Sequence, residues 1–121
     1  MLLLWRHRFI TDTWGWEIPA GRIEDGELAI EAAKREAFEE TGWRPGPLSF
    51  LTSYAPGNGH SNGIFHLFEA DGAVHVGEPS DAAESERVEW LDWSTLRDEI
   101  FNHRVTDGLS LTALLWMLAR Q

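Results

Sequence analysis

The spacing of apolar residues along the chain predicts most of its secondary structure. Runs in which apolar and polar residues alternate, or in which apolar residues are continuous, are typical of strands. Glycine, proline and asparagine separate these runs and predict turns or loops between them. On this pattern, strands are expected at 2–10, 16–18, 48–56, 64–70 and 87–93, with Trp90 of the last strand facing inward.

Apolar residues at helical spacing predict two long helices and a short one. The first runs from about Gly26 to Thr41, with Asp25 as its N-terminal cap and Gly42 as its end. A short helix over 95–101 follows a cap at Ser94. An amphipathic helix covers 107–120, with Leu114 and Leu115 on or near its buried side. Together with the strands, this order predicts an α+β fold with a mixed sheet, in one domain over 1–121.

Composition limits the kinds of partner that the chain can have. Its 121 residues include 20 Asp and Glu but only 10 Lys and Arg, which gives a formal net charge of −10. This charge argues against general binding to nucleic acid or to an anionic membrane, since both need a basic surface. The chain has no Cys, which excludes disulfides, thiolate metal sites and a cysteine nucleophile. No apolar run approaches the length of a membrane span, so we expect a soluble, cytoplasmic protein.

The first long helix is unusually rich in glutamate. At 100° per residue, Glu36, Glu39 and Glu40 share one face, where they repel one another unless a cation lies among them. Carboxylate oxygens at this spacing suit Mg²⁺, and Mn²⁺ is an alternative. Arg35 follows Glu27 by eight residues, about two turns, so a pair between them is expected to tie the helix to the preceding loop. Glu31 is interpreted as ordinary solvated surface.

The segment from Gly21 to Trp43 resembles a known motif. Gly21 is followed after five residues by Glu27, and after seven more by Arg35-Glu36-Ala37-x-Glu39-Glu40-x-Gly42-Trp43. This spacing is similar to the Nudix box, G-x5-E-x7-R-E-U-x-E-E-x-G-U, in which U is hydrophobic. The resemblance implies the Nudix fold, in which a mixed sheet packs between the box helix and the C-terminal helix as an α/β/α sandwich. It also implies a hydrolase that cleaves a nucleoside diphosphate linked to another group, X.

The family resemblance assigns roles to the residues of the box. It implies that Glu36 and Glu40 bind Mg²⁺ directly, and that Glu39 binds a second ion, supports the network or activates the water. The backbone carbonyl of Ala20 is expected to complete the metal shell, beside the tight backbone that Gly21 allows. The cation would neutralise the diphosphate and lower the pKa of a bound water.

Segments outside the box suggest the substrate. WEIPAGRIEDGE at 16–27 resembles a run found in ADP-ribose and sugar-nucleotide pyrophosphatases of the family. LLLWRHRF at 2–9 resembles a strand of the same enzymes, in which the residue matching Arg8 binds the diphosphate. One departure is Asn58, which stands where the ADP-ribose hydrolases carry proline. Stacking on a nucleobase is expected from one of a set of aromatic side chains: Trp5, Trp14, Trp16, Tyr54 and His60.

The general base is left open between three glutamates. Glu84 and Glu86 lie in DAAESERVEW, where many relatives of this subgroup carry a catalytic Glu in a loop before the last strand. Glu39 is the alternative.

Other substrates also stay open, namely nucleoside triphosphates, dinucleoside polyphosphates and capped RNA. A rival function is a nucleotide sensor without catalysis. A homodimer is possible, whereas nucleic-acid and membrane partners are not expected.

Overall fold

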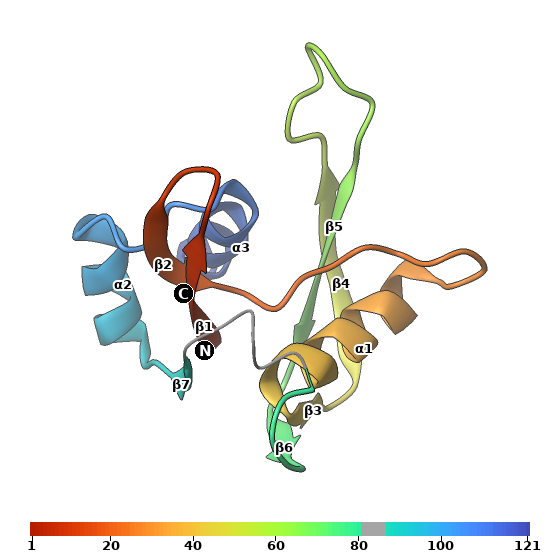
Figure 1. Cartoon of the computed structure of the whole chain (residues 1–121), viewed down its shortest axis with the longest axis horizontal. Coiled ribbons are helices and arrows are strands. Elements are labelled where there is room, and N and C mark those ends of the chain that lie inside the picture. Colours follow the sequence, from red (N-terminus) through yellow and green to blue (C-terminus); the bar gives the residue numbers. More distant parts are fainter. Residues whose placement is uncertain (81–86) are drawn as a thin grey trace. The chain divides into compact units, whose positions relative to one another are not determined.

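The computed structural model describes residues 1–80 and 87–121, which belong to two compact units (Figure 1). The first unit comprises residues 1–18 with the C-terminal part of the chain, and the second comprises 19–80. Each unit is described by itself. Together they contain helices and antiparallel strand pairs, which confirms the α+β class. The single domain expected over 1–121 stays a prediction.

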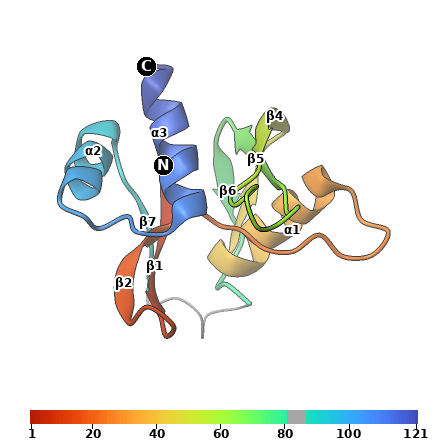
Figure 2. The same ribbon diagram turned by 90° about the horizontal axis from the view of Figure 1, so that it is seen from above.

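A three-stranded antiparallel sheet and two helices form the first unit (Figure 2). The strands are β1 (Leu2–Arg8), β2 (Thr13–Glu17) and β7 (Arg87–Trp90), in the order β2-β1-β7. The helices are α2 (Trp93–Phe101) and α3 (Gly108–Ala119). Each has an aspartate cap, which supplies an acceptor for a backbone N–H that the first helical turn leaves unpaired. Asp92 accepts from Thr95 N at 2.7 Å, and Asp107 accepts from Ser110 N at 2.9 Å.

The core of this unit lies where the sheet meets the loops and helices that follow it. It contains six buried apolar residues, namely Leu3, Trp16, Leu91, Leu96, Val105 and Leu114. Trp16 also donates its indole N–H to Glu99 at 2.8 Å, which satisfies its polar atom. The outer edge of β2 is partly covered, because Trp16 N donates to the carbonyl of Arg104 at 2.8 Å.

The second unit packs one helix on two strand pairs. Helix α1 (Ala29–Thr41) contacts β4 (Leu48–Tyr54) and β5 (Phe65–Ala70), which form an antiparallel hairpin visible in Figure 1. A second pair joins β3 (Trp43–Pro45) to β6 (Ala73–His75). Gly42 ends α1 in the left-handed conformation, at φ 75°, and its N–H donates to Phe38 O at 2.8 Å.

Several local predictions were wrong. Helix α1 begins at Ala29 rather than near Gly26, and its first turn is capped by Glu31, whose carboxylate accepts from Leu28 N at 3.0 Å. Asp25 is therefore not the cap, and Glu31, which is exposed as expected, also caps the helix. Asp92 rather than Ser94 caps α2.

Burial also differs from the sequence pattern at two places. Trp90, expected inward, is 49% exposed, and Leu115, expected on the buried side of its helix, is 46% exposed. The strands β3 and β6 were not predicted, since each has only three residues. No helix in the described ranges has both the length and the apolar character needed to cross a bilayer.

Candidate functional site

Arg35 is the centre of the charged cluster on α1. Its Nε and Nη2 donate to the two carboxylate oxygens of Glu27 at 2.8 and 3.0 Å, and Nη2 also donates to the carbonyl of Arg22 at 3.0 Å. Its Nη1 donates to Glu36 at 2.8 Å and to Glu39 at 3.2 Å. The predicted pair of Arg35 with Glu27 is therefore present, and the same guanidinium gathers two of the predicted metal ligands.

The cluster shifts the pKa values of Glu27 and Arg35. The hydrogen bond from Arg35, together with one from Glu24 N, holds the pKa of the Glu27 carboxyl below its usual range. The bonds to Glu27 and Glu36 in turn raise the pKa of Arg35. Both groups are therefore charged near neutral pH, and Arg35 offsets part of the negative charge that the helix carries.

Glu40 lies in a different setting from its neighbours. It is only 2% exposed, whereas the side chain of Glu39 is 36% exposed. Its Oε1 accepts from the backbone N of Ala20 at 2.9 Å. The bond places the loop before the box against the end of α1, so Ala20 and Glu40 lie side by side.

Gly21 leaves room for Glu36. A β-carbon at position 21 would overlap the Cγ, Cδ and Oε1 atoms of the Glu36 side chain, so only glycine fits here without moving that carboxylate. Gly42 has a different role, since it combines a positive φ with the close approach of the Gly77 carbonyl. The two box glycines therefore serve the site and the helix end, respectively.

The donor set suits a divalent cation. In the described ranges no three Asp, Glu or His side chains converge as ligands of an ion. However, Glu36 and Glu39 both contact one positively charged nitrogen, Arg35 Nη1, so their carboxylates already converge on a single positive point. Hard oxygen donors of this kind are those that Mg²⁺ and Mn²⁺ prefer. Their roles as ligands, and that of the Ala20 carbonyl, stay predictions.

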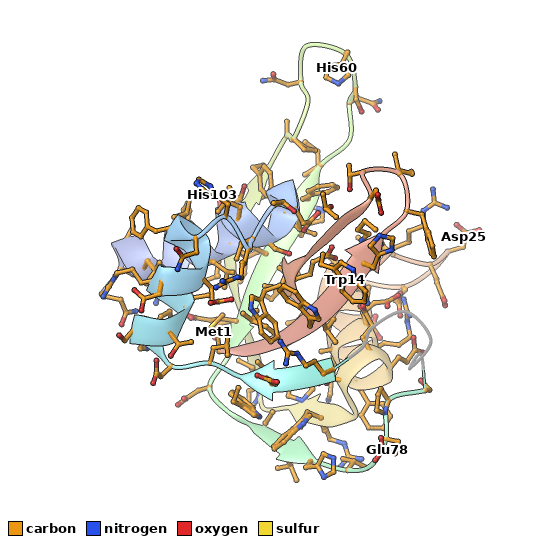
Figure 3. The ribbon with its side chains drawn as sticks, turned by 60° about the vertical axis from the view of Figure 1, so that its left-hand side comes forward. Met1, Trp14, Asp25, His60, Glu78 and His103 are labelled. Carbon is orange, nitrogen blue, oxygen red and sulfur yellow. The ribbon has the colours of Figure 1, made fainter. Side chains whose placement is uncertain are left out.

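In the first unit, Arg8 and Trp14 lie on opposite faces of the β1–β2 hairpin. Arg8 donates from Nε and Nη2 to Glu17, at 3.0 and 2.7 Å, and Arg6 Nη1 approaches the same carboxylate at 3.4 Å. On the other face Trp14, labelled in Figure 3, packs against Trp5 with ring centroids 6.1 Å apart. A small ligand that contacts Arg8 directly therefore does not stack on Trp14 from the same face.

The remaining candidates are divided between the two units. Trp16 is core, whereas Tyr54 ends β4 and packs edge-on against Phe65 at 5.6 Å. His60 lies at the tip of the loop between β4 and β5 (Figure 3). Glu84 and Glu86, predicted as alternatives for the general base, lie outside the described residues.

Sequence reasoning missed four contributors to these clusters. Glu17 and Arg6 were not singled out, although alternation along β1 places Arg6 on the same face as Arg8. The capping function of Glu31 follows from its position three residues after Leu28, a spacing that was available in the sequence. The carbonyl of Arg22 carried no signal, because a backbone acceptor is not visible in side-chain chemistry.

Residues 1–109 match the family model described as NUDIX domain. The chain is 37% identical over 115 residues to CMP-5′-(N-acetyl-N-hydroxy-3-aminopropyl)phosphonate hydrolase of Streptomyces rubellomurinus, covering 94% of this chain and 56% of that protein. It is 36% identical over 84 residues to ADP-ribose pyrophosphatase of Bacillus subtilis, covering 69% and 45%. The chain thus spans about half the length of these relatives.

One solved structure, described as an ADP compounds hydrolase, matches 98% of this chain and 64% of its own, with a TM-score of 0.80 and 20% sequence identity. At this identity the likeness concerns the fold alone. It confirms the fold expected from the sequence.

Proposed function

Because the chain belongs to the NUDIX domain family, we propose that it hydrolyses a nucleotide joined through a phosphorus anhydride to a second group, X, with the help of Mg²⁺ or Mn²⁺. The observation that supports this most strongly is the convergence of Glu36 and Glu39 on Arg35 Nη1. A structural salt bridge needs one acid for one base. Here a single guanidinium serves three carboxylates, an excess of negative charge that a divalent cation would relieve.

The proposed reaction adds water across the P–O–P linkage and gives a nucleoside monophosphate and the phosphate or phosphonate of X. A bound divalent cation would supply charge neutralisation and a more acidic water. Glu36 and Glu40 would hold it, and Gly21 keeps space for the Glu36 carboxylate. Arg35, fixed by Glu27, orients the acids of the helix. The proton of the water passes to a carboxylate, for which Glu39, Glu84 and Glu86 remain alternatives.

Two substrate classes have specific support. The run at 16–27 and the likeness to an ADP-ribose pyrophosphatase favour an ADP-ribose-like or nucleotide-sugar substrate. The likeness to a protein named for CMP joined to a phosphonate covers more of the chain and favours a nucleotide-linked phosphonate. We propose Arg8 as a contact of the phosphate groups and Tyr54 as the stacking candidate. Trp14 lies on the face of the β1–β2 hairpin opposite Arg8, so it is the less favoured stacking candidate. A homodimer and a cytoplasmic location stay predictions.

A substrate panel tests the proposal. Purified protein is incubated with ADP-ribose, a CMP-linked alkylphosphonate, a nucleotide sugar, a diadenosine polyphosphate and nucleoside triphosphates, each with Mg²⁺, with Mn²⁺ and with EDTA. Products are resolved by anion-exchange chromatography. The proposal predicts metal-dependent release of a nucleoside monophosphate from ADP-ribose or the CMP compound. Binding of a nucleotide without cleavage of any compound would instead support the sensor function.

A further inference from the structure

Helix α3 (Gly108–Ala119) carries no charged side chain along its 12 residues. The helix before it in the same unit, α2, contains Arg97, Asp98 and Glu99 within nine residues. A helix with one face in water normally places charged or polar side chains on that face, whereas a helix that is apolar all round is normally covered on every side. The composition of α3 therefore predicts that its outward face is covered as well.

The core of the first unit covers only one face of α3. Ser110, Ala113 and Leu114 are buried, and Leu114 belongs to the apolar core of the unit. At about 100° per residue, the opposite direction is occupied by four side chains within about 60° of one another. These four residues, called the outer face of α3, are Gly108, Thr112, Leu115 and Ala119.

The outer face of α3 is exposed and apolar. Leu115 is 46% exposed, and Trp116 at the border of this face is 41% exposed. Gly108 and Ala119 are exposed as well. Thr112 is the polar member, and its hydroxyl donates to the carbonyl of Gly108 at 2.8 Å, so the helix itself satisfies that group. An exposed apolar face with residues at intervals of three and four is typical of a surface that packs against a second helix.

The order of sizes along the outer face fits a second copy in antiparallel orientation. With a twofold axis across the middle of α3, Gly108 of one copy lies opposite Ala119 of the other, and Thr112 lies opposite Leu115. Each large side chain then meets a smaller one, which allows the helix axes to approach to about 8–10 Å. Such an interface is isologous, so the same four residues supply both halves of it.

Charge also favours a second copy in this orientation. The chain carries a net charge of −10, so two copies repel each other where their acidic surfaces meet. The outer face is uncharged, and the residues just beyond its two ends, Asp107 and Arg120, have opposite signs. An antiparallel pair brings Arg120 of one copy towards Asp107 of the other and opposes the helix dipoles. A parallel pair would bring like charges together at both ends.

We propose that the outer face of α3 binds the same face of a second copy of this chain, in an antiparallel twofold dimer. The face is about 18 Å long. One helix of that length buries less than the roughly 800 Å² per partner found in stable complexes. We therefore expect a weak dimer, with a Kd of about 10–100 µM. The inference does not depend on the hydrolytic activity.

Sedimentation velocity from about 1 to 500 µM protein tests the association. We expect the wild type to change from monomer to dimer over this range. Leu115→Gln should raise the Kd at least about tenfold, because it removes the largest apolar side chain of the outer face. Ile10→Gln is the matched control, since Ile10 is also exposed but lies in the turn between β1 and β2. It should leave the Kd at the wild-type value.

A charge reversal tests the predicted contact at the helix ends. Arg120→Glu places an acid beside Asp107 of the second copy and should raise the Kd about three- to tenfold. Arg97→Glu makes the same change in net charge at an exposed position on α2. It should have a smaller effect on the Kd than Arg120→Glu, because only general repulsion between the copies increases.

The orientation can be measured because the chain has no cysteine of its own. Gly108→Cys and Ala119→Cys both replace exposed residues, and a β-carbon at position 108 meets no atom within 4 Å. In the antiparallel dimer, equivalent cysteines lie about 16 Å apart along the helix axis. With copper phenanthroline as the oxidant, neither variant should cross-link with itself, whereas an equimolar mixture should give a disulfide-linked dimer.

The inference is overturned by any of three results: a monomer at every concentration, a wild-type Kd in Leu115→Gln, or efficient cross-linking of Gly108→Cys with itself. A protein that stays monomeric but cosediments with phosphatidylcholine vesicles would show that lipid covers this face instead, which also overturns the inference. Absence of hydrolysis together with the expected dimer would refute the proposed function and leave this inference standing.

Discussion

Replacing Gly21 by alanine separates the requirements of the site from those of the fold. The added β-carbon would overlap three atoms of the Glu36 side chain, which must then rotate away from Arg35 Nη1, now 2.8 Å distant. The obstructing atoms lie toward the free end of a flexible side chain, and the φ of Gly21 is not positive, so the backbone itself accepts alanine.

The expected cost to folding is therefore small. The lower entropy of the unfolded chain stabilises a glycine-to-alanine variant by about 0.4–1 kcal/mol where the backbone accepts it, which offsets the displacement of one side chain. We expect the free energy of unfolding of Gly21→Ala to stay within about 1 kcal/mol of the wild type. Displacement of Glu36 should nevertheless weaken Mn²⁺ binding about 10–100-fold, the range seen when groups around a metal ligand are disturbed.

Two measurements on the same samples test this prediction. Denaturant unfolding gives stability, and Mn²⁺ titration followed by electron paramagnetic resonance gives affinity. Gly59→Ala is the control, because a β-carbon at position 59 meets no atom within 4 Å. Wild-type Mn²⁺ affinity in Gly21→Ala would refute the assignment of Glu36 as a ligand.

Three further predictions concern the fold. Leu114→Ala should lower the free energy of unfolding by about 3 kcal/mol, whereas Leu115→Ala should change it by no more than about 0.5 kcal/mol. The reason is burial, because Leu114 is 0% exposed and Leu115 is 46% exposed. Equal losses of stability in urea unfolding would contradict this difference in burial along α3. Gly42→Ala should lower the free energy of unfolding by at least about 1 kcal/mol in the same assay, since φ is 75° there and the backbone of Gly77 and Glu78 leaves no space for a β-carbon. The bond from Thr95 N lowers the pKa of Asp92. The stabilisation from this hydrogen bond should therefore be complete above the pKa that Asp92 has in the unfolded chain. It should vanish as the pH falls through the lower pKa of Asp92 in the folded state. The difference in stability between wild type and Asp92→Ala should accordingly narrow below about pH 4, and a constant difference would contradict the cap.

The box was predictable because its chemistry depends on spacing. Glu27, just before α1, and Arg35, on α1, are eight residues apart, or about two helical turns, so they lie close enough to pair. The structure has this pair. The long periodic segments were also predictable, since burial of one face imposes a period on the sequence. The α3 helix begins within one residue of its expected start.

Other features depend on contacts that the sequence pattern does not express. The three-residue strands β3 and β6 form through pairing between residues about thirty apart, and such short runs have no period. Trp90 looked like a core residue by type, but the pairing of Leu2 with Trp90 puts it on the face of the sheet opposite Leu3 and Trp16. The cluster at Glu17 joins residues from two strands, and only the strand register brings them together.

The central claim is that the acids of α1 bind the cation that hydrolysis requires, and Glu40→Gln tests it most directly. The glutamine carbonyl oxygen can still accept the bond from Ala20 N, now 2.9 Å long, so the fold should be retained. Glu31→Gln is the control, because it makes the same charge change on the same helix at the capping position.

The measurement is the steady-state rate of nucleoside monophosphate release with Mg²⁺, on the best substrate of the panel, together with the melting temperature of each variant. We predict a loss of about 100-fold or more for Glu40→Gln, with a melting temperature close to that of the wild type and with Glu31→Gln nearly unchanged in rate. A wild-type rate in folded Glu40→Gln would contradict the account.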